Sequence, residues 1–226
     1  MREPAHEPLH AWNVTPEEAV ALQRRLAPLV RTEGIALDQI HTVAGIDASY
    51  TDRARAAVVV LSFPALEVLD QAVAARETPF PYVPGLLSFR EIPAVLDALQ
   101  KLRVRPDVLM CDGQGFAHPR RFGLASHLGV YLNMPSVGCA KSRLIGRYEE
   151  PGPERGEQSP VFDHGELVAM AVRTKPRTRP LFVSVGHDIA LETAVRLVLA
   201  CTRGYRLPEP TRDADKLAGE ARRADM

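Results

Sequence analysis

Cysteine is scarce in this sequence of 226 residues, which contains only Cys111, Cys139 and Cys201. The three are odd in number, lie far apart in apolar segments and form no C-x-x-C pair. This pattern argues against a disulfide framework and against a cysteine-based metal site. We expect buried, reduced thiols of the kind found in cytosolic proteins.

Long hydrophobic runs are also missing. No apolar stretch approaches the ~18 residues that a membrane span needs, and the N-terminal MREPAHEPLHAW lacks the apolar region of a signal peptide. We therefore expect a cytoplasmic protein with no membrane partner. The length allows one sizeable core, and we expect a monomer with a single domain over residues 1–226.

Net charge is absent as well, because 28 basic residues balance 28 acidic ones. Attraction to a polyanion would therefore have to come from local basic patches. Basic runs lie at 118–121, 141–143 and 173–179. Each run taken alone fits a solvated surface.

The order of elements predicts an α/β chain. Thr15, Pro16 and Glu18 form the start signal of a helix that we expect to run to about residue 31. Strand-like segments at roughly 41–50, 56–63 and 66–75 have short connectors, which favour an antiparallel meander. Alternating helices and strands follow, with a hairpin turning at 163–166. The expected fold is a mixed β-sheet flanked by helices.

Acidic residues end two of the apolar strands. Asp47 closes TVAGID and Asp112 closes DVLMCD, and a carboxylate at the rim of a buried sheet is costly unless it is paired, hydrogen-bonded or metal-bound. The alternative is a turn-forming Asp, since Asp112-Gly113 is a common turn dipeptide. Glu91 in SFREIP is a third acid, and its alternative is a solvated helix surface. Three oxygen ligands would suit Mg²⁺ or Mn²⁺ better than zinc. These three acids, together with the basic runs, fit a metal-dependent enzyme that cleaves phosphodiester bonds.

The segment TPFPYVPG, residues 78–85, has three prolines in six residues. Proline excludes both a helix and an interior strand here, yet the segment carries two aromatic residues and a valine. It predicts a rigid loop tip with an apolar face. The alternative is a Pro-rich hairpin in which Tyr82 packs against its own domain.

Several of these pieces occur together in one family. The sequence resembles endonuclease V, the deoxyinosine 3′-endonucleases, in an ordered series of segments that spans about residues 12 to 217. The segments are VAGIDASY (43–50), PYVPGLLSFRE (81–91), DGQGFAHPRRFGLASHLGV (112–130), GCAKSRL (138–144), VRTK (172–175), FVSVGHDI (182–189) and RLPEPTR (206–212). The second and third are long enough that chance is a poor explanation.

The resemblance implies a ribonuclease-H-like fold and a DNA repair activity. Such an enzyme uses Mg²⁺, for which Mn²⁺ can substitute, to hydrolyse the second phosphodiester bond 3′ to deoxyinosine in DNA. The products carry a 3′-OH and a 5′-phosphate, and inosine in RNA is a further candidate substrate.

The resemblance also implies roles for individual residues. Asp47 and Asp112 match the metal ligands, Glu91 the third acid and Lys141 the catalytic lysine, while Asp215 stands where some members have a histidine and is a further candidate. PYVP matches a wedge that separates the strands, since an enzyme that reads one base must take it out of the stack. The positions implied to contact DNA are Pro81, Tyr82, Val83, Pro84, Gly85, Leu87, Arg90, Gly113, His118 and Gly138.

Two other functions remain open on the sequence. One is a ribonuclease-H-like nuclease for junctions or RNA–DNA hybrids, although such an enzyme has no evident need for PYVP. The other is a lesion-binding protein without catalysis, although pure binding would not require Asp47, Glu91, Asp112 and Lys141.

Overall fold

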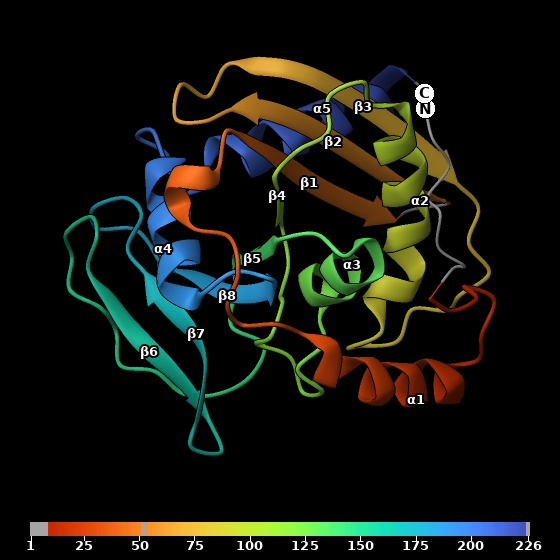
Figure 1. Cartoon of the computed structure of the whole chain (residues 1–226), viewed down its shortest axis with the longest axis horizontal. Helices are drawn as coiled ribbons and strands as arrows, with labels where there is room; N and C mark the ends of the chain where they lie inside the picture. The colour runs from red at the N-terminus through yellow and green to blue at the C-terminus, as the bar shows by residue number, and fades with distance from the viewer. Residues whose placement is uncertain (1–8, 51–52, 225–226) are drawn as a thin grey trace.

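The computed structural model describes residues 9–50 and 53–224. Within them a mixed sheet has the strand order β3-β2-β1-β4-β5-β8-β7-β6, with helices on both sides (Figure 1). The strands are β1 (Thr42–Tyr50), β2 (Ala54–Ser62), β3 (Val68–Arg76), β4 (Val108–Cys111), β5 (Ser136–Ala140), β6 (Gln158–Asp163), β7 (Glu166–Val172) and β8 (Leu181–His187). The predicted fold class is confirmed, as are the first three strands to within about two residues.

The centre of the sheet brings distant acids together. β1 pairs with β2 in antiparallel register and with β4 in parallel register, where Ile46 lies opposite Cys111. The amide of Asp112 donates to the carbonyl of Ile46 at 3.0 Å. Asp47 and Asp112 directly follow the paired residues Ile46 and Cys111, so the parallel register makes them neighbours although 65 residues separate them. Asp47 lies inside β1, which continues to Tyr50, and not at the end of a strand as predicted.

Helices cover both faces of the sheet. The α-helices are α1 (Pro16–Leu26), α2 (Leu87–Lys101), α3 (Leu124–Leu132), α4 (Leu191–Ala200) and α5 (Glu209–Ala224). Alternate strand residues divide between two cores, because successive side chains point to opposite faces. Ala44 and Ile46 pack with residues of α2 and α3, whereas Val43 packs with residues of α4. All three cysteines are buried and free, as predicted.

The first helix starts as predicted but ends earlier. Thr15 and Glu18 form the expected capping box. The α-helix stops at Leu26 and continues only as a 3₁₀ turn, Ala27–Leu29. Pro28 lies in that turn and has no N–H to donate to the preceding turn of an α-helix, so the prediction of a helix to residue 31 was wrong.

Helix α5 lies unusually close to β1. A Cβ added at Gly45 would sit 1.8 Å from the carbonyl oxygen of Pro210, so only glycine permits this approach. The contact sets α5 alongside β1 and brings Asp215 within electrostatic reach of Asp47. No helix in the described part of the chain is long and apolar enough to cross a membrane.

Candidate active site

Asp47 is a partly buried carboxylate on β1. Burial, with added repulsion from Asp112 and Asp215, raises the pKa of Asp47 to about 6. The charge of Lys141 acts in the opposite direction but does not outweigh these effects. The position therefore holds more negative charge than its protein neighbours neutralise.

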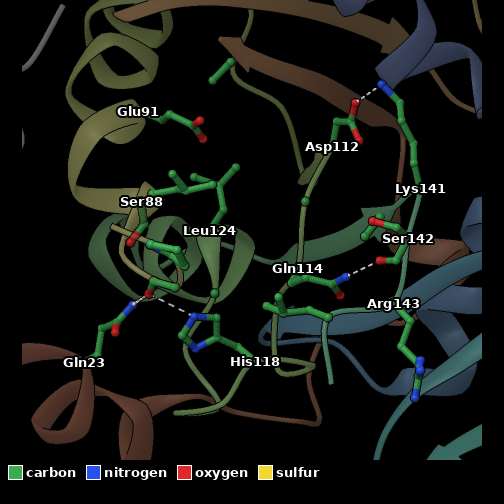
Figure 2. Close-up of a pocket in the computed structure, with 18 of the residues that line it drawn as sticks. Gln23, Ser88, Glu91, Asp112, Gln114, His118, Leu124, Lys141, Ser142 and Arg143 are labelled. Atoms are coloured by element: carbon green, nitrogen blue, oxygen red, sulfur yellow. Dashed lines mark hydrogen bonds and ion pairs between the residues drawn. The ribbon is translucent and has the colours of Figure 1, made fainter. Parts of the chain in front are cut away.

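Glu91 approaches the same region from the second turn of α2. Burial raises the pKa of Glu91 to about 8, and the charges of Asp47 and Asp112 contribute. Figure 2 shows its carboxylate on the α2 side of the cavity, with Asp112 on the strand side. The structure thus brings Asp47, Glu91 and Asp112 into one electrostatic group, although they come from three separate elements.

Lys141 follows β5 and forms an ion pair with Asp112, with Nζ and Oδ2 separated by 2.5 Å (Figure 2). Burial alone would lower the pKa of Lys141, but Asp112 outweighs it and the pKa is raised. Lys141 is therefore a cation, and its ammonium contacts Asp112, one of the candidate metal ligands.

The fit of a divalent ion can be judged from these donors. Among residues 9–50 and 53–224, no three His, Cys, Asp or Glu side chains lie close enough to form a ready-made metal site. The donor chemistry fits nonetheless, because the carboxylates are hard oxygen ligands. Burial and the repulsion between these acids raise the pKa values of Asp47 and Glu91. Lys141 pairs with Oδ2 of Asp112, so a cation at that oxygen would compete with the ammonium.

A cavity of 420 Å³ opens beside these groups. Glu91, Asp112 and Lys141 are among the residues that line it. The other predicted site residues in its wall are Tyr82, Pro84, Gly85, Leu87, Gly113 and His118. Three of the four predicted catalytic residues therefore share one space with six of the predicted DNA-contacting residues, and this space also includes apolar walls from Leu124 and Leu144.

Tyr82 stands at the tip of the proline-rich loop. Its exposed fraction is 68%, so the alternative in which Tyr82 packs against its own domain is wrong. Val83 instead points inward and packs with Phe80 and Phe89. Behind the tip, the guanidinium carbon of Arg90 lies 3.3 Å from the ring centroid of Tyr50 and 5.9 Å from that of Tyr82.

Gly138, Asp47 and Asp215 lie outside this cavity wall. Gly138 is buried in β5, and a Cβ there would meet the amide of Gly115 at 2.4 Å, so this glycine supports the loop behind the cavity wall. Asp215 is exposed on α5 and lines a second cavity, of 510 Å³, together with Asp47 and Ser49. The basic residues Arg212, Lys216, Arg222 and Arg223 line the same cavity.

Several residues of the predicted basic runs bind to the protein itself. Arg121 pairs with Asp163 at 2.9 Å and with Glu166 at 2.7 Å. Arg173 is buried and donates to the carbonyls of Gly152 and Pro151 at 2.9 and 2.7 Å. These arginines hold loops in place and are not free to contact a phosphate.

Gln23 is a cavity residue that the sequence analysis missed. It lies on α1, is almost fully buried and lines the cavity. A signal was present, because Gln23 occupies the same helix face as the buried Ala19 and Leu26. A polar side chain on an apolar helix face requires hydrogen-bond partners in the core.

Comparison with known proteins gives consistent matches. The family model for endonuclease V matches residues 24–216. An endonuclease V of Roseiflexus sp. (strain RS-1) is 57% identical over 212 residues, which is 93% of this chain and 95% of that protein. The crystal structure of an endonuclease V from Streptomyces avermitilis superimposes with a TM-score of 0.89 at 44% identity, covering 95% of this chain and 96% of the other.

A further similar structure contains a nucleic acid. It is that of endonuclease V from Ciona intestinalis in complex with a 23mer DNA containing an inosine followed by a ribo-adenosine. It has a TM-score of 0.83 at 31% identity and covers 94% of this chain and all of the other.

Proposed function

The chain belongs to the endonuclease V family, and we propose that it is a metal-dependent DNA repair enzyme specific for deoxyinosine. It hydrolyses the second phosphodiester bond 3′ to the lesion and leaves a 3′-OH and a 5′-phosphate. One observation carries the proposal: Glu91, Asp112 and Lys141 line the same cavity as Tyr82, Gly85 and His118. A site for phosphodiester chemistry thus adjoins a space where an extruded base can be held. The inosine-containing DNA bound by the Ciona relative supports this choice of lesion.

The proline-rich loop provides the strand-separating wedge. Tyr82 presents an exposed aromatic face, and Pro81 and Pro84 restrict the backbone on either side of it. Inserting such a ring between bases offsets part of the cost of unstacking them. Inosine pairs weakly, so its extrusion costs less than that of a normal base, and this difference contributes to selectivity.

The cavity then receives the extruded base. Leu87, Leu124 and Leu144 supply apolar surface for a purine ring. Gly113 lacks a side chain where a Cβ would approach Leu124 at 3.2 Å, which leaves room in the wall. A mostly apolar space with a few polar groups is usual for small-molecule and base sites.

Asp47, Asp112 and Glu91 are the candidate ligands for Mg²⁺, with Asp215 close enough to act on the same charge. Such an ion would orient a water for attack and stabilise the leaving oxygen. Lys141 forms an ion pair with Asp112. Its ammonium can stabilise the negative charge that develops on the scissile phosphate.

Inosine in RNA is the second candidate substrate. The Ciona relative binds a strand in which a ribonucleotide follows the inosine, on the side where this family's cut would fall. Oligonucleotides that carry one deoxyinosine or one riboinosine would separate the two substrates by rate.

The test uses such oligonucleotides with a label at one end. We expect the wild type with Mg²⁺ to cut once, at the second bond 3′ to the lesion. Asp112→Asn should bind the inosine duplex but lose nicking, because an amide is a poor replacement for an anionic metal ligand. Undiminished nicking by this variant, or cuts unrelated to the lesion, would overturn the proposal.

A further inference from the structure

The carbonyl oxygen of Gly85 accepts three side-chain hydrogen bonds. Gln23 Nε2 donates at 3.0 Å, Arg120 Nη2 at 2.8 Å and His118 Nε2 at 3.0 Å. Figure 2 shows the lines from Gln23 and His118 converging on this one oxygen. Three donors, one of them charged, thus converge on a single oxygen of the loop backbone.

The donors are fixed by their other partners. Gln23 Nε2 also donates to the carbonyl of Phe122 at 3.1 Å, and its Oε1 accepts from Arg120 Nε. The backbone amide of Arg120 donates to His118 Nδ1 at 3.2 Å, which leaves the proton of the neutral imidazole on Nε2. Both ring nitrogens of His118 are therefore used by the protein, and neither is free for a base.

Gly85 lies at the junction between the loop that carries Tyr82 and helix α2, which carries Glu91. Gly85 has a φ of +78°, and a Cβ there would lie 2.8 Å from Arg120 Nη2. It stands two residues before α2. Leu86, the residue at the N-cap of α2, makes no side-chain capping bond, so the bonds to Gly85 add to the packing of Leu86 and Phe89 at the start of this helix.

We propose that Gln23 is a positioning residue for the wedge, acting through Gly85 together with His118 and Arg120. The prolines restrict the loop internally, but a wedge also needs a fixed base, or insertion would tilt the whole loop. Gln23 comes from α1, and His118 and Arg120 come from the segment between β4 and α3. Through Gly85, these three residues tie the wedge to two other parts of the fold. The inference rests on the proposed function, since it assumes that Tyr82 separates bases.

The test measures selectivity and stability separately. Gln23→Met removes both donors and the acceptor at nearly constant volume. Affinity for an inosine duplex and for the same duplex without inosine would be measured by fluorescence anisotropy in EDTA. KM and kcat would be measured with Mg²⁺. We expect the preference for inosine to fall about tenfold, the usual effect of losing a hydrogen bond to a buried group. KM should rise while kcat changes less than twofold.

Gln100→Met is the matched control, because it makes the same change at an exposed position near the far end of α2. It should leave the preference and KM unchanged. If Gln23→Met fails to fold, Gln23→Glu is the second variant, since it keeps an acceptor for Arg120 but has no N–H to donate to Gly85. An unchanged preference in a folded variant would overturn the inference.

A double-mutant cycle identifies the route of the effect. If Gln23 acts through the wedge, Gln23→Met should not reduce the preference further in a Tyr82→Ala background. Additive losses would overturn the inference, because Gln23 would then act independently of Tyr82. A wild type with no preference for inosine would instead refute the proposed function, and the two failures are thereby distinguished.

Discussion

The Nζ atom of Lys141 lies 2.5 Å from Oδ2 of Asp112, so a lysine ammonium occupies one side of a candidate metal ligand. Among residues 9–50 and 53–224, Asp47 and Glu91 have no such ion-pair partner. Under the proposed function, we expect a divalent ion to compete with the ammonium for Oδ2 of Asp112.

Lys141→Met should separate metal binding from catalysis. We expect nicking of bound inosine duplex to fall about 10²–10³-fold, the usual cost of losing one group that stabilises transition-state charge. Affinity for Mg²⁺ should rise, because Asp112 loses its competing cation. Single-turnover cleavage and the Mg²⁺-dependent rise of Tm would measure the two effects.

Lys175→Met is the control for this variant, since Lys175 is exposed and lies outside the cavity. It should change neither measurement. Weaker Mg²⁺ binding by Lys141→Met would contradict the competition.

Tyr82→Ala should weaken recognition of inosine more than binding to undamaged duplex. Tyr82→Phe should behave like the wild type, because the aromatic face and not the hydroxyl enters the stack. Base–aromatic stacking contributes about 1–3 kcal/mol per base, so we expect a loss of about tenfold or more in affinity for the inosine duplex. Competition binding in EDTA would measure it.

Tyr205→Ala provides the matched control for the wedge. Tyr205 is another exposed tyrosine, its ring lies 4.3 Å from the guanidinium carbon of Arg212, and it is not part of the cavity wall. Its loss should leave the inosine preference intact. An equal loss for both duplexes in Tyr82→Ala would make Tyr82 a general contact.

Local patterns were sufficient to predict most of the fold. Alternating and continuous apolar runs located β1, β2 and β3, and the capping box located the start of α1. Asp47 and Asp112 were predicted to share a metal ion from their places after apolar runs and from the resemblance to endonuclease V. The parallel pairing of β1 with β4 makes them neighbours, although β1 continues past Asp47 to Tyr50.

Long-range hydrogen bonds were not predictable in the same way. Arg173 looked like part of a basic surface run, yet its guanidinium holds the loop around Pro151 and Gly152. Gln23 reaches partners 62 and 99 residues away. No local pattern states which backbone carbonyls a polar side chain will meet after the chain has folded.

His118 should make stability depend on pH. Burial, together with the charges of Arg120 and Arg121 and against the effect of the Gly85 hydrogen bond, lowers the pKa of His118 from its ordinary 6.5 to about 4. The unfolded chain takes up this proton near pH 6.5 and the folded chain does not. The contribution of neutral His118 to the free energy of unfolding is therefore fully present above pH 6.5 and is lost as the pH falls toward 4.

His118→Gln isolates this effect, because glutamine can still donate to Gly85 but does not titrate. Protonation of Asp47 and Glu91 occurs in both proteins and cancels in the difference. We expect the free energy of unfolding of the wild type, relative to the variant, to fall by roughly 2 kcal/mol between pH 8 and pH 4.5. Urea denaturation at each pH would measure it, and a constant difference would show that His118 is protonated equally in both states.

The cavity between β1 and α5 predicts where a second stretch of the nucleic-acid backbone lies. Arg212 is already paired with Glu209, but no carboxylate in the described part of the chain forms an ion pair with Arg222 or Arg223. Asp47 and Asp215 share this cavity with both arginines. A phosphate backbone that passed from these acids along α5 would meet Arg222 and Arg223, which form no ion pair among the described residues.

Arg222→Gln combined with Arg223→Gln should therefore flatten the dependence of affinity on salt. Each phosphate contact contributes about 0.9 to the slope of log K against log salt concentration, so loss of two contacts should reduce the slope by about 2. The control is Arg103→Gln with Arg105→Gln, which removes two exposed charges just before β4, at the edge of the sheet opposite Asp112. Binding of inosine duplex between 50 and 200 mM salt would measure both slopes. Equal slopes in the two double variants would mean that the backbone does not follow α5.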